Sequence, residues 1–146
     1  MSTIEMPKPD QSVLDRKAQI VEALCKVLPS DSVIFDEHET RAYECDGLTA
    51  YRCPPLVAVL PRTSQECAAA MRVCHDLNVT VVPRGAGTSL AGGALPTADC
   101  VILGTARLKD VLEVDYDNRI IRVQTGVTNL SVTGMVEDDG YFYAPD

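Results

Sequence analysis

Hydrophobic positions in the first third of the chain follow a helical spacing and then lose their order. From Ser12 to Leu28 apolar side chains recur every three or four residues, which predicts an amphipathic helix that Pro29 ends. The short apolar run Val33–Phe35 is typical of a small strand. Residues 36–52 are polar and irregular, with a turn signal at Asp46-Gly47. This part therefore predicts one helix, one small strand and an irregular connection.

The pattern then changes to strand, helix, strand. Leu56–Leu60 is continuously apolar, as in a strand covered on both faces. Thr63 and Glu66 have the spacing of a capping box, so a helix is expected to begin there and to run to Leu77. Asn78 is a suitable C-terminal cap for it. We assign the inward face of this helix to Ala68, Met71, Cys74 and either His75 or Leu77.

Further strands follow. Val79–Val82 predicts a second buried strand, parallel to the first, and Val101–Leu103 a third. Two later runs flank Asp117-Asn118, which predicts a hairpin with a two-residue turn. A last helix is expected from a cap at Thr128 or Asn129 to about Asp139, where Gly140 ends it. The chain thus divides into a flexible leader (1–11), a helix with an irregular segment (12–53), an α/β unit (54–105) and the start of a second unit (106–146).

The net charge and the length of the apolar stretches exclude several classes of function. The chain has 13 Lys and Arg against 21 Asp and Glu, a formal charge of −8. This balance argues against a nucleic-acid groove or an anionic membrane surface, which need clustered positive charge. No stretch approaches the roughly 18 apolar residues of a spanning helix. The polar first ten residues lack the layout of a secretory signal. A cytoplasmic protein is expected.

The cysteines and histidines do not form a recognisable metal pattern. Reduced, mostly buried thiols are the favoured interpretation, ahead of metal ligation and of disulfides, because no CxxC pair occurs and no export signal is seen. His38 lies in an acidic stretch that we interpret as a solvated loop in preference to a metal site, and we interpret His75 as a structural residue. No metal is expected. The six cysteines are Cys25, Cys45, Cys53, Cys67, Cys74 and Cys100.

The stretch after the second strand carries the clearest chemistry. Four of the chain's nine glycines fall within nine residues, from Gly85 to Gly93. Glycines allow positive φ and close approach of a ligand, and successive amides in such a turn can form a nest for an anion. Thr88 and Ser89 add hydroxyl donors, and Arg84 either adds a charge or anchors the loop. A diphosphate suits this arrangement, although glycine-rich loops also occur as plain connections.

Two common phosphate-binding templates are excluded. No Lys follows the glycines, so the loop is not that of a P-loop NTPase. Gly85-Ala86-Gly87 begins a G-x-G-x-x-G pattern, but its third glycine position is Leu90, and Gly92-Gly93 would break a helix there. The anion would therefore be held by the loop itself and not by a helix N-terminus.

The segment Pro83–Pro96 resembles the pyrophosphate loop of FAD-linked oxidases of the vanillyl-alcohol oxidase type, which have a PCMH-type FAD-binding domain. Pro55–Pro61 resembles the first strand of that family, and Tyr143–Asp146 the start of its Pro-Asp-Pro-Ser-Ser segment. Within the family, Tyr43–Leu48 and Gly126–Leu130 are most similar to the FAD-binding subunit of bacterial glycolate oxidase and to D-lactate dehydrogenases.

The resemblance implies a fold class, a cofactor and a set of binding residues. It implies an α/β (α+β) FAD domain whose first subdomain is complete and whose second is truncated, with the catalytic residues beyond residue 146. A covalent histidine of the family would stand at Thr88, so FAD is expected to be bound non-covalently. Pro61 is expected near the adenosine, and Pro145 and Asp146 near the flavin. The expected pyrophosphate ligands are Arg84, Gly85, Ala86, Gly87, Thr88, Ser89 and Gly92.

The same resemblance implies an activity for the full-length protein. It would be an oxidoreductase acting on a small 2-hydroxy acid such as glycolate or D-lactate. Iron–sulfur and second flavin subunits would be its partners and would hold it at the periphery of the inner membrane. Residues 1–146 alone are expected to be inactive. The alternative is a non-catalytic fragment or interaction module that binds another anion or no ligand and self-associates. Four tyrosines either stack on a ring system or pack in the interior: Tyr43, Tyr51, Tyr141 and Tyr143.

Overall fold

The part of the chain that ends at Gly104, which we call the first unit, is built on a four-stranded mixed sheet. The computed structural model describes residues 6–144. The strand order is β1-β2-β4-β3, with β1 antiparallel to β2 and the other neighbours parallel. All three strands expected up to residue 104, and the small strand before them, are confirmed. Their bounds are Val33–Ile34 (β1), Val57–Val59 (β2), Val81–Arg84 (β3) and Val101–Gly104 (β4).

The strand β3 was expected to be buried, but its place in the sheet leaves it at the edge. The strand β3 is parallel to β2, as predicted, but β4 lies between them, so β3 forms the edge of the sheet. Its residues are half-buried or exposed, whereas the sequence predicted a buried strand. Apolar composition alone does not distinguish a central strand from an edge strand.

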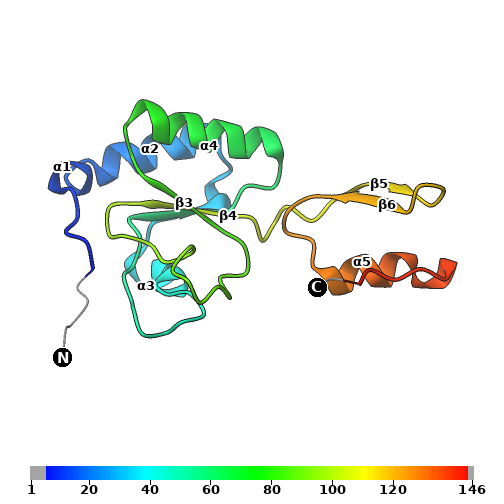
Figure 1. Ribbon diagram of the computed structural model, residues 1–146. Coiled ribbons are helices and arrows are strands. Elements are labelled where there is room, and N and C mark those ends of the chain that lie inside the picture. Colours follow the sequence, from blue (N-terminus) through cyan, green and yellow to red (C-terminus); the bar gives the residue numbers. More distant parts are fainter. Residues whose placement is uncertain (1–5, 145–146) are drawn as a thin grey trace.

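Helices α1 (Gln11–Leu14), α2 (Lys17–Val27) and α4 (Ser64–Asp76) cover one face of the sheet (Figure 1). The sequence predicted one helix over 12–28, but it is interrupted at Asp15-Arg16. There the Arg16 guanidinium donates to the carbonyl oxygen of Leu77, 3.0 Å away. The core lies between these helices and the sheet; its most buried members include Ile20, Leu24, Val57, Val59, Ala70, Cys74 and Val101.

Helix α4 begins where the capping pattern predicts. The Glu66 amide donates to Thr63 Oγ1 at 3.1 Å. The Glu66 carboxylate accepts from the Arg62 amide at 2.7 Å, one residue before the position that a standard capping box uses. Asn78, with φ of 52°, ends the helix as expected.

The inward face of α4 was only partly predicted. Cys74 and Ala70 are buried, and Leu77 is half-buried. The expected inward positions Ala68 and Met71 are exposed, so those two assignments are wrong; of the alternatives His75 and Leu77, it is Leu77 that packs against the core. Since α4 packs against α2 as well as the sheet, its buried stripe is centred on the small residue Ala70, which permits close approach of the two helices.

The opposite face of the sheet carries the irregular connections. Residues 36–52 include a short helix α3 (Glu37–Thr40), capped by Asp36, and a 3₁₀ turn at Arg41–Tyr43. Together with the glycine-rich loop between β3 and β4, this segment lies across the sheet from α2 and α4 (Figure 1). Two segments far apart in the sequence are therefore brought side by side.

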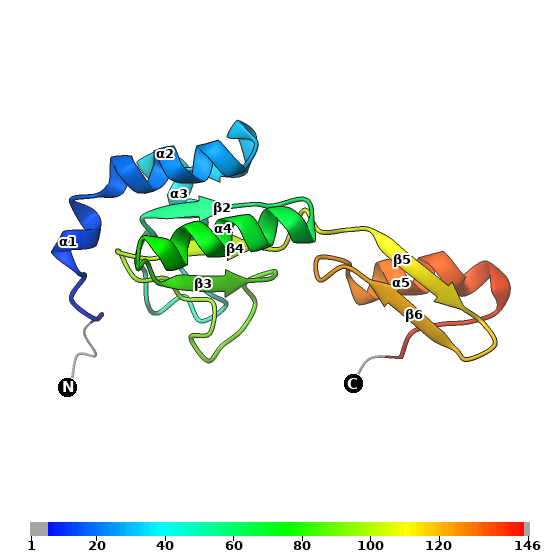
Figure 2. The same cartoon turned by 90° about the horizontal axis from the view of Figure 1, so that it is seen from above.

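The second unit lies beyond the carboxyl ends of β2, β3 and β4 (Figure 2). It contains the hairpin β5 (Val111–Asp115) and β6 (Ile120–Val123), followed by α5 (Asn129–Val136). The hairpin turn has four residues, 116–119, instead of the expected two, because Arg119 takes the left-handed conformation with φ of 57°. Thr128 caps α5, a 3₁₀ turn extends it to Asp139, and Gly140 ends it with φ of 80°, as predicted.

The second unit leaves much apolar surface exposed. Between the hairpin, α5 and the following residues lies a hollow of about 410 Å³. Among the described residues of this unit, several large apolar side chains are more than a third exposed: Leu112, Val114, Tyr116, Ile120, Leu130, Met135, Tyr141, Phe142 and Tyr143. None of the helices within residues 6–144 has the length and apolar character that crossing a membrane requires.

Candidate functional site: the glycine-rich loop

The glycine-rich loop leaves the carboxyl end of β3 and returns to the amino end of β4. The carboxyl ends of parallel strands are where α/β sheets bind ligands. Its first residues, Gly85 and Ala86, are exposed at this edge, on the side that faces the second unit. The position that the sequence predicted for the loop is therefore the position that the structure gives it.

Arg84 anchors the loop from within. Its Nη1 donates to the carbonyl oxygens of Cys45 at 2.7 Å and Ala94 at 3.2 Å. Its guanidinium carbon lies 5.9 Å from the centre of the Tyr43 ring, a cation–π distance. Of the two roles considered for Arg84, anchoring is the one seen, and its partners are backbone carbonyl oxygens.

Gly87 is required by this anchor. A Cβ added at Gly87 would lie 2.2 Å from Arg84 Nη2, and the residue has φ of +73°, where side chains are strained. The guanidinium therefore occupies the space that a side chain at residue 87 would need. The packing of Arg84 and the positive φ are therefore sufficient to explain why residue 87 is glycine, without any ligand.

Asp46 and Gly47 hold the far side of the loop. Asp46 is 5% exposed, and its Oδ2 accepts from the Gly92 amide at 3.0 Å. Gly47 donates its amide to the carbonyl oxygen of Ser89 at 2.9 Å. The sequence marked Asp46-Gly47 only as a turn; no signal in the sequence showed that it contacts the loop. The Gly92 amide, which we expected to bind pyrophosphate, is thus already paired with Asp46.

The amides at the start of the loop remain available. Within residues 6–144, the N–H groups of Gly85–Leu90 have no protein acceptor. Unpaired backbone donors are costly unless water or a ligand accepts from them. A run of such donors suits a polyanionic group, as the nest interpretation requires.

Two glycines of the loop have no internal reason to be glycine. At Gly85 and Gly93 an added Cβ would meet nothing within 4 Å, and neither residue has positive φ. Their missing side chains leave the loop surface open for close approach of a ligand to the backbone. The open surface and the free amides together fit the diphosphate of a nucleotide cofactor.

A cleft of about 420 Å³ adjoins the loop; we call it the loop cleft. Gly85 and Ala86 form one wall, and the opposite wall is the connection from β6 to α5 in the second unit. Lys109 is exposed at its rim, and sequence reasoning missed both Lys109 and this wall. The lining residues are Gly85, Ala86, Thr105, Ala106, Lys109 and Thr125–Asn129.

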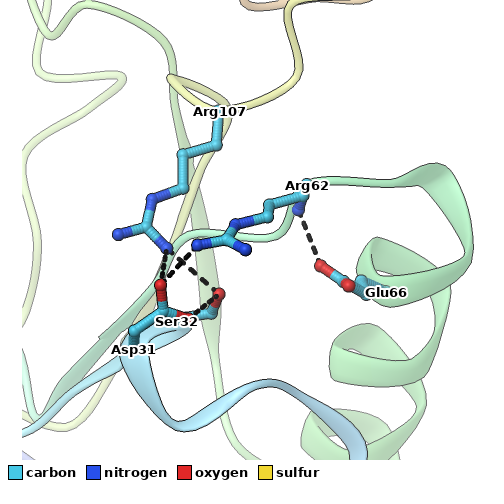
Figure 3. A network of polar contacts seen from close by, with 5 residues as sticks. All are labelled: Asp31, Ser32, Arg62, Glu66 and Arg107. Carbon is cyan, nitrogen blue, oxygen red and sulfur yellow. Dashed lines mark hydrogen bonds and ion pairs between the residues drawn. The ribbon is translucent and has the colours of Figure 1, made fainter.

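A second hollow of about 540 Å³ continues along the same edge and shares Ala106 and Lys109 with the loop cleft. It follows the ends of β2 and β4 and is lined by Arg62, Thr63, Ala106, Arg107, Lys109 and Asp110. Figure 3 shows how its two arginines are held. Arg62 and Arg107 both pair with Asp31, and Arg107 also donates to Ser32 Oγ at 3.2 Å.

The remaining expected site residues have different surroundings. Pro61 is less than 2% exposed, so it is buried and does not itself form a ligand surface. Pro145 and Asp146 lie outside the described residues. Tyr43 packs on Arg84, and Tyr141 on Tyr116 with ring centres 5.4 Å apart, so both have packing roles. Tyr51 is half-buried and Tyr143 is exposed.

The cysteines have no metal-binding arrangement in the described part of the chain. No group of three or more His, Cys, Asp or Glu residues there could hold a metal ion. All six cysteines are free. Cys74 and Cys100 are buried, and this burial raises the pKa of both thiols to about 11, so they are protonated at neutral pH. Cys25 is exposed, however, and three others are half-buried, so "mostly buried" is only partly correct.

Fold and site together define a nucleotide-binding α/β domain of the flavin-dependent type. The FAD binding domain family matches residues 55–146, more than half of the chain. The chain therefore belongs to the family of FAD-binding domains, and FAD is the cofactor that fits the loop.

Relatives agree with this assignment. The glycolate oxidase subunit GlcD of Escherichia coli (strain K12) is 43% identical over 130 residues, which are 89% of this chain and 26% of that protein. D-lactate dehydrogenase of Archaeoglobus fulgidus is 35% identical over 126 residues, 80% of this chain and 24% of that protein. The chain thus spans about a quarter of the length of these relatives.

Solved structures show the same fold. The crystal structure of p-cresol methylhydroxylase with substrate bound superposes with a TM-score of 0.76 at 17% identity, covering 90% of this chain and 26% of that one. At this identity the likeness concerns the fold alone. It confirms the expected PCMH-type architecture.

Proposed function

We propose that the full-length protein is an FAD-dependent oxidoreductase that acts on a small 2-hydroxy acid of the glycolate or D-lactate type. The observation that carries this proposal is the 43% identity to a glycolate oxidase subunit over 89% of the chain. A D-lactate dehydrogenase and a D-2-hydroxyglutarate dehydrogenase are also among the relatives, which supports the same substrate class. Bound FAD supplies the redox chemistry, and the protein supplies binding and orientation.

The part played by residues 1–146 is cofactor binding. The amides of Gly85–Ser89 bind the diphosphate, and Lys109 adds positive charge beside it. The hollow after β2 and β4 takes the adenosine; Arg62 and Thr63, which follow the buried Pro61 in the chain, line it. Thr88 stands where covalent members of the family have histidine, so the cofactor is held non-covalently. Substrate binding and proton abstraction belong to other parts of the protein, so residues 1–146 alone do not turn over substrate.

We further propose partners and a location for the full-length protein. A glycolate oxidase subunit is by its name part of a larger assembly, and we extend this to the present protein. Iron–sulfur and second flavin subunits then accept the electrons and hold the protein at the inner membrane from the cytoplasmic side. Co-purification of a tagged full-length protein with an iron–sulfur subunit tests this; its recovery without any partner from a membrane-containing lysate contradicts it.

The alternative is a non-catalytic module that uses the loop for another anion or for none. The exposed apolar side chains of the second unit favour it, because such surface promotes self-association. Equilibrium dialysis with FAD, AMP and inorganic diphosphate separates the two functions. Binding of FAD in clear preference to diphosphate supports the flavin site, and equal weak binding supports the alternative.

A glycine substitution tests the loop assignment directly. Gly85→Ala adds a methyl group to the open surface, where it meets no protein atom, so the apoprotein should keep its stability. We expect FAD content after purification to fall by about tenfold, as for a loss of roughly 1.4 kcal/mol of binding free energy. Gly134→Ala, in α5 with its nearest neighbour 3.9 Å away, is the matched control and should retain FAD. Unchanged flavin absorbance in Gly85→Ala would contradict the assignment.

The activity has its own test. The full-length protein should reduce a dye acceptor when given glycolate or D-lactate, with the D-isomer of lactate preferred. The chain of residues 1–146 should show no such turnover. Dye reduction by this shorter chain would mean that the catalytic groups are not where the proposal places them.

A further inference from the structure

The residues Tyr43–Gly47, which we call the brace, lie outside the segment that matches the FAD-binding family and yet contact the loop at several points. Tyr43 and Cys45 contact Arg84 at the start of the loop. Gly47 contacts Ser89 in its middle, and Asp46 contacts Gly92 near its end. These contacts fix the glycine-rich part of the loop from Arg84 to Gly92.

We propose that the brace is a cofactor-positioning element, in which Asp46 holds the pyrophosphate loop in its binding shape without touching the cofactor. This inference rests on the proposed FAD site. It assigns part of the affinity for FAD to residues upstream of the family domain.

The geometry of Asp46 makes it specific for this role. Its Oδ1 accepts from the Leu48 amide and its Oδ2 from the Gly92 amide, both at 3.0 Å. Both carboxylate oxygens therefore accept from backbone donors inside a buried site. An asparagine offers one oxygen and one NH₂ group, so one of the two amides would face a donor instead of an acceptor.

Gly47 makes the second fixed contact. A Cβ at this residue would lie 2.6 Å from the carbonyl oxygen of Thr88. Because that neighbour is backbone, the loop itself would have to move. The close approach of Gly47 to the loop therefore sets the path of Thr88 and Ser89, two of the residues whose amides bind the diphosphate.

The expected effect is on the population of the binding-competent loop. When only a fraction of molecules has the loop in shape, the apparent dissociation constant rises in inverse proportion to that fraction. The bound state is the same once FAD is saturating. A positioning role thus predicts weaker binding with an unchanged spectrum of the bound flavin.

The test uses the full-length protein after removal of FAD. For Asp46→Asn we expect the dissociation constant for FAD to rise by about tenfold or more, since a charge-assisted hydrogen bond is lost. The flavin spectrum at saturating FAD should match that of the wild type, and far-UV circular dichroism of the apoprotein should show that the variant is folded. Asp36→Asn is the matched control, because Asp36 accepts from two amides of its own helix through Oδ1 and makes no hydrogen bond with the loop in the described part of the chain.

A second variant keeps the test decisive if Asp46→Asn folds poorly. Gly47→Ala leaves the charge unchanged and should also weaken FAD binding by about tenfold, whereas Gly134→Ala should not. Wild-type affinity in both brace variants would overturn the inference and leave the FAD site standing. A wild-type protein that binds no FAD would overturn the proposed function and the inference together.

Discussion

At the scale of single residues, the glycines of the loop divide into two kinds. Gly87 and Gly92 have positive φ, and Arg84 also fills the space beside Gly87, whereas Gly85 and Gly93 have neither constraint. In the sequence all of them contribute alike to one glycine-rich motif. Only coordinates separate the glycine that protein packing requires from the glycines that a ligand requires.

Substituting the first kind should damage the fold as well as the site. Gly87→Ala puts a side chain at φ of +73° and displaces the Arg84 guanidinium from its carbonyl partners. We expect a loss of about 1–3 kcal/mol in the free energy of unfolding of the apoprotein. Gly93→Ala is the comparison and should change that free energy by less than about 0.5 kcal/mol. Urea unfolding of both variants measures the difference, and equal midpoints would contradict it.

The buried thiols predict a pH dependence of stability. Burial raises the pKa of Cys74 and Cys100 from 9.0 to about 11, so the folded state binds protons that the unfolded state has lost. The free energy of unfolding should therefore be fully retained below pH 9 and decrease as the pH rises toward 11. Urea unfolding between pH 8 and pH 11 measures this slope. Cys74→Ala should reduce the slope, whereas a Cys25→Ala variant, altered at an exposed thiol, should keep it.

The residue scale also shows where sequence reasoning reached its limit. Arg84 was recognised as an anchor or a charge, but its partners Cys45 and Ala94 are 39 and 10 residues away in sequence. Asp46 was recognised as a turn residue, and its partner Gly92 is 46 residues away. Local patterns indicate what a residue can donate or accept; they do not indicate which distant group the fold brings to it.

At the scale of elements, local chemistry predicted the ends of helices better than their faces. The caps Thr63 and Thr128 and the stops Asn78 and Gly140 are all confirmed, because a cap is set by contacts within four residues. The inward face of α4 was only partly predicted, because its packing against α2 decides which positions are buried. The length of the hairpin turn was predicted two residues too short, because Arg119 adopts a conformation that non-glycine residues seldom take.

The cap of α4 gives a prediction at this scale. Thr63→Ala removes the hydroxyl that accepts from the Glu66 amide, and α4 contributes Ala70 and Cys74 to the core. We expect a loss of about 1 kcal/mol in the free energy of unfolding. Ser64→Ala, at the adjacent exposed position, should cost less than half of this. Urea denaturation of the two variants is the measurement, and a more harmful Ser64→Ala would refute the role of the cap.

At the scale of the whole molecule, the two units join through a narrow backbone crossing. The Gly126 amide donates to the carbonyl oxygen of Leu108 at 2.8 Å. A Cβ at Gly126 would lie 2.1 Å from the carbonyl oxygen of Thr105, which is also backbone. We expected a boundary between the two units at residues 105 and 106, but nothing in the sequence indicated this crossing.

Breaking the crossing should loosen one unit and spare the other. In Gly126→Ala we expect amide hydrogen exchange to become faster in the hairpin and α5, because a two-stranded hairpin with one helix has little stability of its own. Exchange in β2, β4 and α4 should stay as in the wild type. Mass spectrometry of peptides after timed labelling measures this. Uniform loss of protection across both units would argue against the boundary that we propose at residues 105 and 106.

The position of the brace bears on how such proteins are divided for expression. A gene fragment that starts at residue 55, where the similarity to the FAD-binding family begins, would encode every glycine of the motif and none of Tyr43–Gly47. Its glycine-rich segment would lack the hydrogen-bond partners that Cys45, Asp46 and Gly47 supply. The same fragment would also lose α1, α2 and β1, which supply Val13, Ile20, Leu24 and Val33 to the core. A fragment intended to retain the yellow of bound flavin should therefore begin before α1, so that it keeps the brace together with the core that supports it.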